Sequence, residues 1–243
     1  MKSEFKIMFD YLDWCLCYNI YMIIDHTSKS YLERWNALGA NRFNGAYYYS
    51  KEIVKNIIPN VKTTRNWITI NAYNNEGIDH SIVFMHNTFH PEVYNWMMDF
   101  KDMVIVTSLP HLIKELGYLG EVIYLPLSID VSYVEKFKKK RKTKDVAFVG
   151  RLSKLKHYEQ LNIHFDNDVD LIGNMPREKL LKEVAKYKRV YATGRVALEA
   201  KVLGCEILSY HPLFPDPVLW QVLDNKDAAK ILQKKLNEID GVI

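Results

Sequence analysis

The chain has 243 residues, of which 48% are hydrophobic and 26% are charged, and its formal net charge is +4 at pH 7. These values are typical of a folded protein with a substantial core and exclude an intrinsically disordered chain. The positive excess is small and partly concentrated in residues 136–144, so the overall charge does not indicate nucleic-acid binding.

Hydropathy and cysteine usage indicate a cytoplasmic protein. Every apolar run is shorter than the roughly 20 residues that a transmembrane helix needs. The N-terminal segment is interrupted by Asp10 and Asp13, which makes it a poor signal peptide. The cysteines Cys15, Cys17 and Cys205 are odd in number, and the first two are too close for a comfortable disulfide, as expected in a reducing compartment.

Short apolar runs alternate with amphipathic segments along the chain. In the first half, strands are predicted at residues 20–24, 67–70, 81–85, 103–107 and 121–125, with helices at residues 49–57 and 111–116. In the second half, strands are predicted at residues 146–149, 169–172, 190–192 and 206–209, with helices at residues 177–186, 196–203 and 227–239. Strands that alternate with helices indicate parallel sheets with crossover helices, the α/β class.

A basic segment, residues 136–144, separates the two series and has almost no apolar content. It predicts a linker between two Rossmann-like domains, residues 1–135 and 145–243, which face each other across a cleft where doubly wound folds bind ligands. The favoured interpretation of its cations is an exposed connector. The alternative is a weak contact with a membrane surface or a polyanion, which would make the protein peripheral at the membrane.

Two motifs in the second half carry the chemistry. A run of strand-forming residues ends at Gly150 and is followed by Arg151 and, five positions later, Lys156. About forty residues downstream, Gly194 opens an amphipathic segment that carries Glu199. A strand ending in Gly-Arg and a helix starting at glycine can each hold a phosphate through backbone N–H groups and cations, and the carboxylate can accept hydrogen bonds from a ribose. Together they predict a nucleoside diphosphate site.

Val-Ala-Phe-Val-Gly-Arg-Leu-Ser-Lys-Leu-Lys and Thr-Gly-Arg-Val-Ala-Leu-Glu-Ala resemble the donor-site motifs of GT-B glycosyltransferases. The resemblance implies that residues 1–135 form the acceptor-side domain and residues 145–243 the nucleotide-sugar-binding domain. It also implies that Glu199 binds the ribose. The implied ligands of the donor diphosphate are Gly150, Arg151, Lys156, Gly194, Arg195 and Val196.

The first half resembles the same family more faintly. Asn44-Gly45-Ala46 is similar to the glycine loop beside the acceptor, and Ile82-Val-Phe-Met-His86-Asn87 to the strand ending in a histidine that reaches the donor sugar. The resemblance implies a catalytic role for His86 and places Gly45 and Asn87 beside the donor sugar or acceptor. Tyr191 stands where the family has a first glutamate, next to the transferred sugar, and Arg195 replaces an apolar residue and can compensate by binding phosphate.

Two groups of potential metal ligands are not interpreted as metal sites. They are His80, His86 and His90, and Asp166, Asp168 and Asp170. Pro91 and the preceding strand place the histidines in a loop with no further ligand nearby to complete a zinc set. The acids lead directly into a strand, with Leu171 where a calcium loop needs glycine. No metal and no cofactor besides the nucleotide-sugar substrate is therefore expected.

The resemblance therefore predicts a metal-independent hexosyltransferase whose nucleotide-sugar donor is a UDP sugar. It also predicts that the transferred sugar retains its anomeric configuration. The alternatives are a noncatalytic nucleotide- or sugar-binding protein on the same scaffold, which the tyrosine at position 191 favours, and a nucleotide-sugar epimerase. The acceptor stays open among a cell-wall polymer, a lipid, a protein and a modified DNA base.

Overall fold

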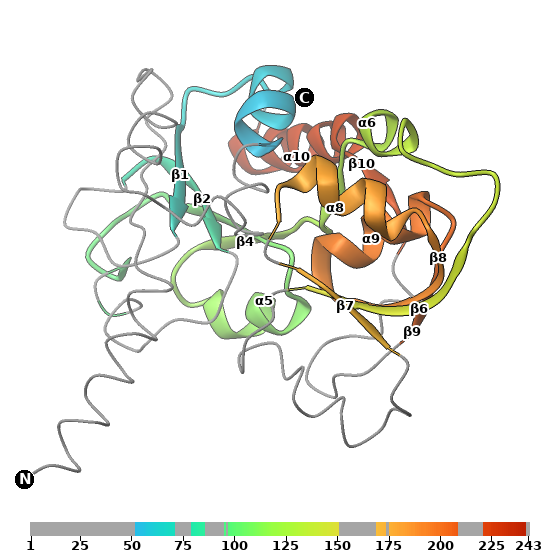
Figure 1. Cartoon of the computed structure of the whole chain (residues 1–243). Coiled ribbons are helices and arrows are strands. Elements are labelled where there is room, and N and C mark those ends of the chain that lie inside the picture. The colour runs from blue at the N-terminus through green and yellow to red at the C-terminus, as the bar shows by residue number, and fades with distance from the viewer. Residues whose placement is uncertain are drawn as a thin grey trace, which may run out of the picture. The chain divides into compact units, whose positions relative to one another are not determined.

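The computed structural model describes residues 52–70, 79–85, 95, 97–150, 169–173, 175–208 and 221–241. These residues form helices and parallel sheets in two compact units (Figure 1). Described residues within Val61–Pro126 and Lys230–Ile243 belong to the first unit, and those within Arg42–Asn60 and Leu127–Ala229 to the second. Within the described ranges, no helix combines the length and apolar content that crossing a membrane requires.

The first unit is built on a four-stranded sheet in which every strand pair is parallel. Its order is β1-β2-β3-β4, with bounds Asn66–Ile70, Ser81–Met85, Val104–Thr107 and Glu121–Tyr124. Every residue of β2 and β3 is buried, as expected for central strands of a parallel sheet covered on both faces. Helix α5 (Pro110–Leu116) connects β3 to β4 and has its proline in the first turn.

Alternate residues of the first sheet build two faces. Val83 and Ile105 point to one face and pack in one core cluster with Leu112 of α5. On the neighbouring position of β2, Phe84 stacks on Trp67 of β1, with ring centroids 5.9 Å apart. The apolar runs in the sequence therefore become strands because both of their faces are buried.

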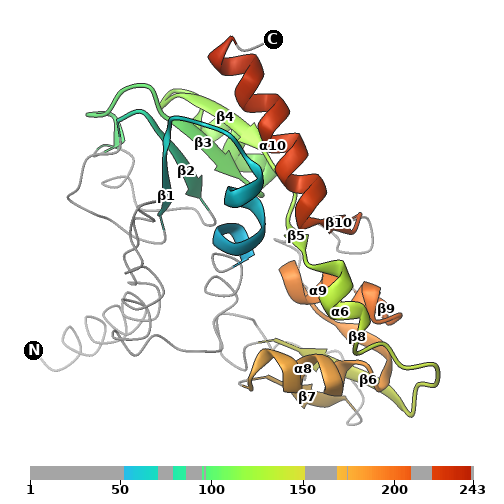
Figure 2. The same ribbon diagram turned by 90° about the horizontal axis from the view of Figure 1, so that it is seen from above.

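The second unit contains a second four-stranded parallel sheet in the order β7-β6-β8-β9, with bounds Asp170–Ile172, Lys144–Val149, Tyr187–Tyr191 and Glu206–Leu208 (Figure 2). Helix α8 (Arg177–Val184) leads from β7 to β8, and α9 (Gly194–Val202) leads from β8 to β9. A two-stranded parallel pair, β5 (Ser128–Ile129) and β10 (Leu223–Asp224), and helix α6 (Val131–Glu135) complete the unit's regular structure among the described residues.

Helices α8 and α9 cover the same face of this sheet. The chain moves across the sheet in one direction from β7 to β8 to β9, and right-handed crossovers then put both connecting helices on one side. The core agrees, because Leu181 of α8 and Ala197 of α9 share one buried cluster with Val149 and Val190 of the sheet. This packing fixes the start of α9 at the end of β8.

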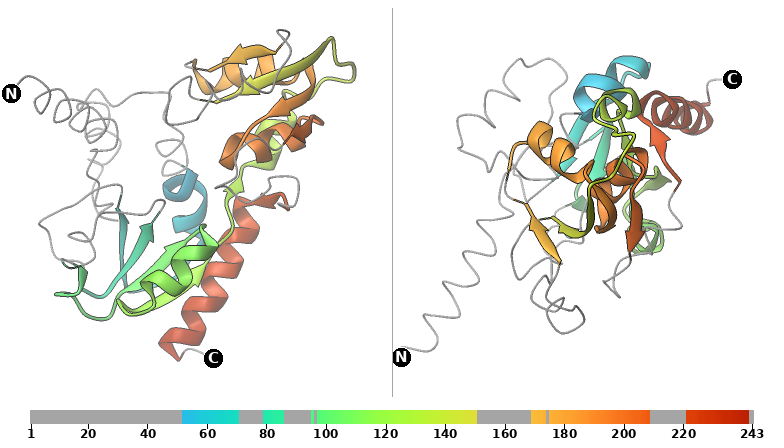
Figure 3. Two further views of the ribbon diagram at one scale, coloured as in Figure 1. Left: turned by 90° about the horizontal axis from the view of Figure 1, so that it is seen from below. Right: turned by 45° about the vertical axis from the view of Figure 1, so that its right-hand side comes forward.

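The terminal helix α10 (Asn225–Asp240) is the red helix of Figure 3. The predicted α-helix at residues 49–57 is replaced, in its described part, by a π-helical turn, η1 (Ile53–Ile57), and a 3-10 turn, η2 (Ile58–Asn60). Pro59 lies in the second turn, and it lacks the N–H that would continue an α-helix.

The α/β class with parallel sheets is confirmed. Each predicted strand from residue 67 onward corresponds to an observed strand with ends within a few residues, and the helices predicted after residue 110 are also present. The strand predicted at residues 20–24 lies outside the described residues. Residues 136–144, predicted as an interdomain linker, lie inside the second unit and connect α6 to β6.

One lysine of this basic segment is part of the packed structure. The ammonium group of Lys142 donates hydrogen bonds to the carbonyl oxygens of Ala185, at 3.1 Å, and of Leu203, at 2.7 Å. These residues are the C-caps of α8 and α9. A cation is stabilising there because helix C-terminal carbonyls carry partial negative charge.

Replacing Lys142 by methionine is expected to lower the free energy of unfolding by about 1.5–3 kcal/mol, because both charge-assisted hydrogen bonds are lost while the aliphatic stem is kept. Urea denaturation measures the change. The matched control is Lys140→Met in the same segment, where the lysine is exposed and the expected change is within about 0.5 kcal/mol. Equal effects of the two substitutions would contradict the capping role.

Candidate functional site

The predicted site residues divide between described and undescribed parts of the chain. Those described are Gly150, Tyr191, Gly194, Arg195, Val196 and Glu199, all in the second unit. Those outside the described residues are Gly45, His86, Asn87, Arg151 and Lys156, so their roles stay predictions. The same holds for His90, Asp166 and Asp168 among the potential metal ligands.

The structure brings the two glycine motifs to one edge of the second sheet. Gly150 directly follows β6, and Gly194 is the first residue of the helix that follows β8. Strands β6 and β8 are parallel neighbours, with Phe148 opposite Tyr191. Because the carboxyl ends of parallel strands meet at one edge, Gly150 and Gly194 follow adjacent strands at the edge where α/β folds bind ligands.

The two glycines differ in what their backbones can offer a ligand. Gly194 has a φ of 62°, which favours glycine, and a Cβ added there would meet no atom of the described residues within 4 Å. The N–H of Gly150 donates to the carbonyl of Ile172 on β7 at 3.0 Å, and it is therefore committed to the sheet. The backbone N–H of Gly150 is therefore not available to a ligand at this edge.

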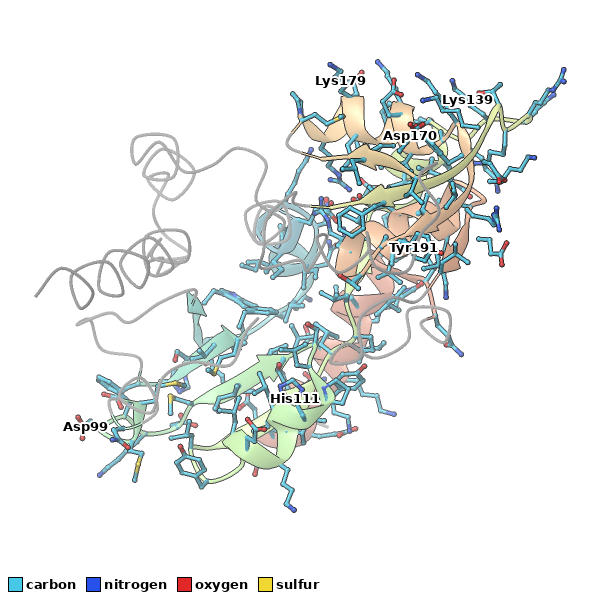
Figure 4. All side chains as sticks on the ribbon, turned by 60° about the horizontal axis from the view of Figure 1, so that its bottom comes forward. Asp99, His111, Lys139, Asp170, Lys179 and Tyr191 are labelled. Carbon is cyan, nitrogen blue, oxygen red and sulfur yellow. The ribbon has the colours of Figure 1, made fainter. Side chains whose placement is uncertain are left out.

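Tyr191 is the last residue of β8 and is half-buried (Figure 4). Burial raises the pKa of its phenol, and nearby Arg189 partly offsets that increase. The side chain is therefore neutral at physiological pH. It can donate a hydrogen bond, but it supplies no negative charge.

Arg195 and Glu199 face inward from α9. Glu199 is 2% exposed and Arg195 is 8% exposed. They lie one helical turn apart, with Nη2 of Arg195 3.2 Å from Oε1 of Glu199. Arg177, near the start of α8, approaches the same oxygen: its Nε donates a hydrogen bond at 3.1 Å and its Nη2 lies 2.9 Å away.

Glu52, just before η1, completes the group. Its Oε1 forms ion pairs with Nη1 of Arg177 and with Nη1 of Arg195, the latter at 3.1 Å. Its Oε2 accepts hydrogen bonds from Nδ2 of Asn225 at 2.8 Å and from the backbone N–H of Asp130 at 3.2 Å. Glu52, Arg177, Arg195 and Glu199 are called the buried ion cluster below.

The charges of the buried ion cluster balance. Burial alone would lower the pKa of Arg177, but the attraction of Glu199 and Glu52 and the hydrogen bonds to them raise it. The guanidinium of Arg177 therefore stays charged. The cluster contains two cations and two carboxylates, and each carboxylate contacts both cations. A buried ion of this kind is stable only while its partners are present.

Sequence reasoning missed Glu52 and Arg177. Each carried a weak signal. Glu52 directly precedes Ile53, and the apolar positions of this helical pattern, Ile53 and Ile57, are buried. The side chain of Glu52 therefore begins next to buried residues. Arg177 opens α8, although the positive end of a helix dipole disfavours a cation there, and such a cation needs a carboxylate nearby.

Among the described residues, no group of three or more His, Cys, Asp or Glu side chains has the arrangement of a metal site. Asp170, one of the acids considered above, accepts hydrogen bonds from Lys144 at 2.9 Å and from Tyr187 at 2.6 Å at the amino ends of the strands. Comparisons with protein-family models and with curated proteins give no match.

Proposed function

We propose that the second unit binds a nucleoside diphosphate sugar and that the protein is a metal-independent glycosyltransferase of GT-B type with a UDP-sugar donor. The observation that supports this most is the juxtaposition of Gly150 and Gly194 at the carboxyl edge of neighbouring parallel strands. Arg151 and Lys156 follow one glycine in the sequence, and the other glycine starts helix α9. This is the combination that a diphosphate needs.

Such a transfer forms a bond from an acceptor hydroxyl oxygen to the anomeric carbon and breaks the bond from that carbon to the diphosphate oxygen. The hydroxyl proton passes to the departing diphosphate. The bonding electrons leave with UDP, so negative charge grows on the departing phosphate. Backbone N–H groups of α9 and the cations Arg151 and Lys156 would stabilise that charge in place of a metal. His86 is proposed to contact the donor sugar, and Glu199 the ribose.

A noncatalytic nucleotide-binding protein is the second candidate. The observation that favours it is Tyr191, which is neutral where the family supplies a carboxylate beside the transferred sugar. The two candidates share the nucleotide site and differ in turnover. Release of UDP from a panel of UDP sugars, with and without candidate acceptors, separates the enzyme from the binding protein. Analysis of the sugar product identifies an epimerase, the remaining alternative.

The phosphate site is tested by Arg151→Ala and Lys156→Ala. Each substitution removes a charge-assisted interaction of about 1.5–3 kcal/mol, so UDP affinity should fall about ten- to a hundredfold with little change in melting temperature. Isothermal titration calorimetry measures the affinity. Lys188→Ala, at a 63% exposed side chain on β8, is the matched control and should bind UDP normally. Unchanged affinity in both test variants would rule the phosphate assignment out.

Chelation tests the metal-independent mechanism. UDP release by the wild-type protein in millimolar EDTA is expected to stay within about twofold of the untreated rate, because fixed cations and backbone N–H groups neutralise the diphosphate. Loss of activity that magnesium or manganese restores would contradict the mechanism and direct attention to Asp166, Asp168 and Asp170.

A further inference from the structure

The connection between α6 and β6 is held in place at both ends. At its start, the N–H of Lys138 donates to the carbonyl of Glu135 at 3.0 Å. At its end, the N–H of Thr143 donates to the carbonyl of Lys186 at 2.8 Å, and Lys142 binds the two helix C-caps. The segment between these anchors is therefore a defined turn of the second unit.

The cations of this segment fall into two classes. Lys142 and Lys144 are engaged by the fold, the latter through Asp170 and Tyr187. The four residues from Lys138 to Arg141 are exposed, and none of the ion pairs found among the described residues includes them. They are called the basic turn, which consists of Lys138, Lys139, Lys140 and Arg141.

Helix α8 extends the positive surface. Lys139 lies near enough to Glu183 to help lower the pKa of that carboxyl, which is lowered chiefly by a hydrogen bond from Lys186. Exposed Lys179 lies on the same helix, and Figure 4 shows that Lys139 and Lys179 both project outward from the second unit. Neighbouring lysines of α8 are already paired, Lys182 with Glu178 and Lys186 with Glu183.

The shape of the basic turn indicates what it contacts. Figures 1 to 3 show the connection between α6 and β6 projecting beyond the sheet of its unit. Four adjacent cations on a projecting turn can all approach a flat anionic surface. Binding along a nucleic-acid strand instead relies on a groove that follows successive phosphates. The shape therefore favours a flat partner.

We propose that the basic turn docks the protein on the surface of an anionic lipid bilayer. The turn lies at the amino end of β6, whereas Gly150 lies at its carboxyl end, so docking leaves the proposed nucleotide site uncovered. Each cation near an anionic surface strengthens binding about fivefold, and salt screens the attraction. The association is therefore reversible and independent of the proposed function.

The test is co-sedimentation of the full chain with vesicles of phosphatidylcholine alone or with about 30% phosphatidylserine. Wild-type protein is expected to bind only the anionic vesicles and to be released by raising NaCl from about 50 to 500 mM. The variant K138Q/K139Q/K140Q/R141Q should bind at least about thirtyfold more weakly, which corresponds to losing two fully engaged cations. Its UDP affinity and melting temperature should match those of the wild type.

The matched control variant is K101Q/K114Q/K226Q/K234Q, which removes the same charge from exposed positions elsewhere. It should keep its binding to anionic vesicles. Equal loss in both variants, or equal binding to neutral vesicles, overturns the proposal. Release from the vesicles by inorganic phosphate at constant ionic strength overturns the proposal in favour of a small-anion site. The proposal is also overturned, in favour of nucleic acid, if the protein binds a 20-base-pair DNA duplex more tightly than the vesicles and the basic-turn variant loses that binding.

Discussion

Replacing Glu52 by alanine is expected to lower the free energy of unfolding by about 3–5 kcal/mol, because it leaves two guanidinium groups, 14% and 8% exposed, with one carboxylate of the cluster instead of two. Arg177 and Arg195 both form ion pairs with Glu52 Oε1. The same substitution removes the acceptor used by Asn225, which is 2% exposed. Urea denaturation followed by circular dichroism measures the loss.

Two further variants separate the charge of Glu52 from its packing and from general effects of removing an acid. Glu52→Gln keeps the size of the side chain and a carbonyl acceptor, so it should cost less than alanine. Glu178→Ala removes an acid whose ion pair with Lys182 is 59% exposed on both sides, and exposed pairs contribute only about 0–1 kcal/mol. A cost at Glu52 no greater than at Glu178 would show that the buried ion cluster contributes nothing to stability.

The strands could be predicted because their signal is local. The run that becomes β2 is apolar at nearly every position, and every one of its residues is buried. Likewise, the glycine that ends β6 and the glycine that starts α9 mark backbone transitions that a few neighbouring residues determine. Parallel pairing then follows from the alternation of strands and helices.

The buried ion cluster could not be predicted because its members are far apart in the sequence. Glu52 and Arg195 are separated by 143 positions, and no periodic pattern relates them. The basic segment illustrates the same limit. Composition correctly indicates that most of it is exposed, but the carbonyl partners of Lys142 lie 43 and 61 positions away, so its capping role depends on the folded unit.

The same cluster sets a condition on the proposed role of Glu199. The side chain is 2% exposed, and its Oε1 forms ion pairs with Arg177 and Arg195. These cations would hold the carboxylate in a fixed orientation, which favours hydrogen bonds to ribose hydroxyls if a nucleotide reaches it. They would equally account for Glu199 as a purely structural residue, so binding has to be measured together with stability.

Glu199→Gln is expected to weaken UDP binding about a hundredfold and to reduce the difference in affinity between UDP and 2′-deoxy-UDP. A carboxylate that accepts two ribose hydroxyls makes two charge-assisted hydrogen bonds, each worth about 1.5–3 kcal/mol, and only the ribonucleotide supplies both donors. Calorimetric titration of both nucleotides against both proteins gives the two affinities and their ratio.

The matched control is Glu52→Gln, which perturbs the buried ion cluster at its other carboxylate. If Glu199 binds the ribose, Glu52→Gln lowers stability but still binds UDP more tightly than 2′-deoxy-UDP. Glu199→Gln then loses this preference for UDP. If Glu199 only compensates the two arginines, both variants lose stability and both keep the preference. An unchanged ratio of the UDP and 2′-deoxy-UDP affinities in Glu199→Gln would therefore assign this carboxylate to the core of the second unit and leave the ribose to another residue. The proposed phosphate site at Gly194 is tested separately by the Arg151 and Lys156 variants.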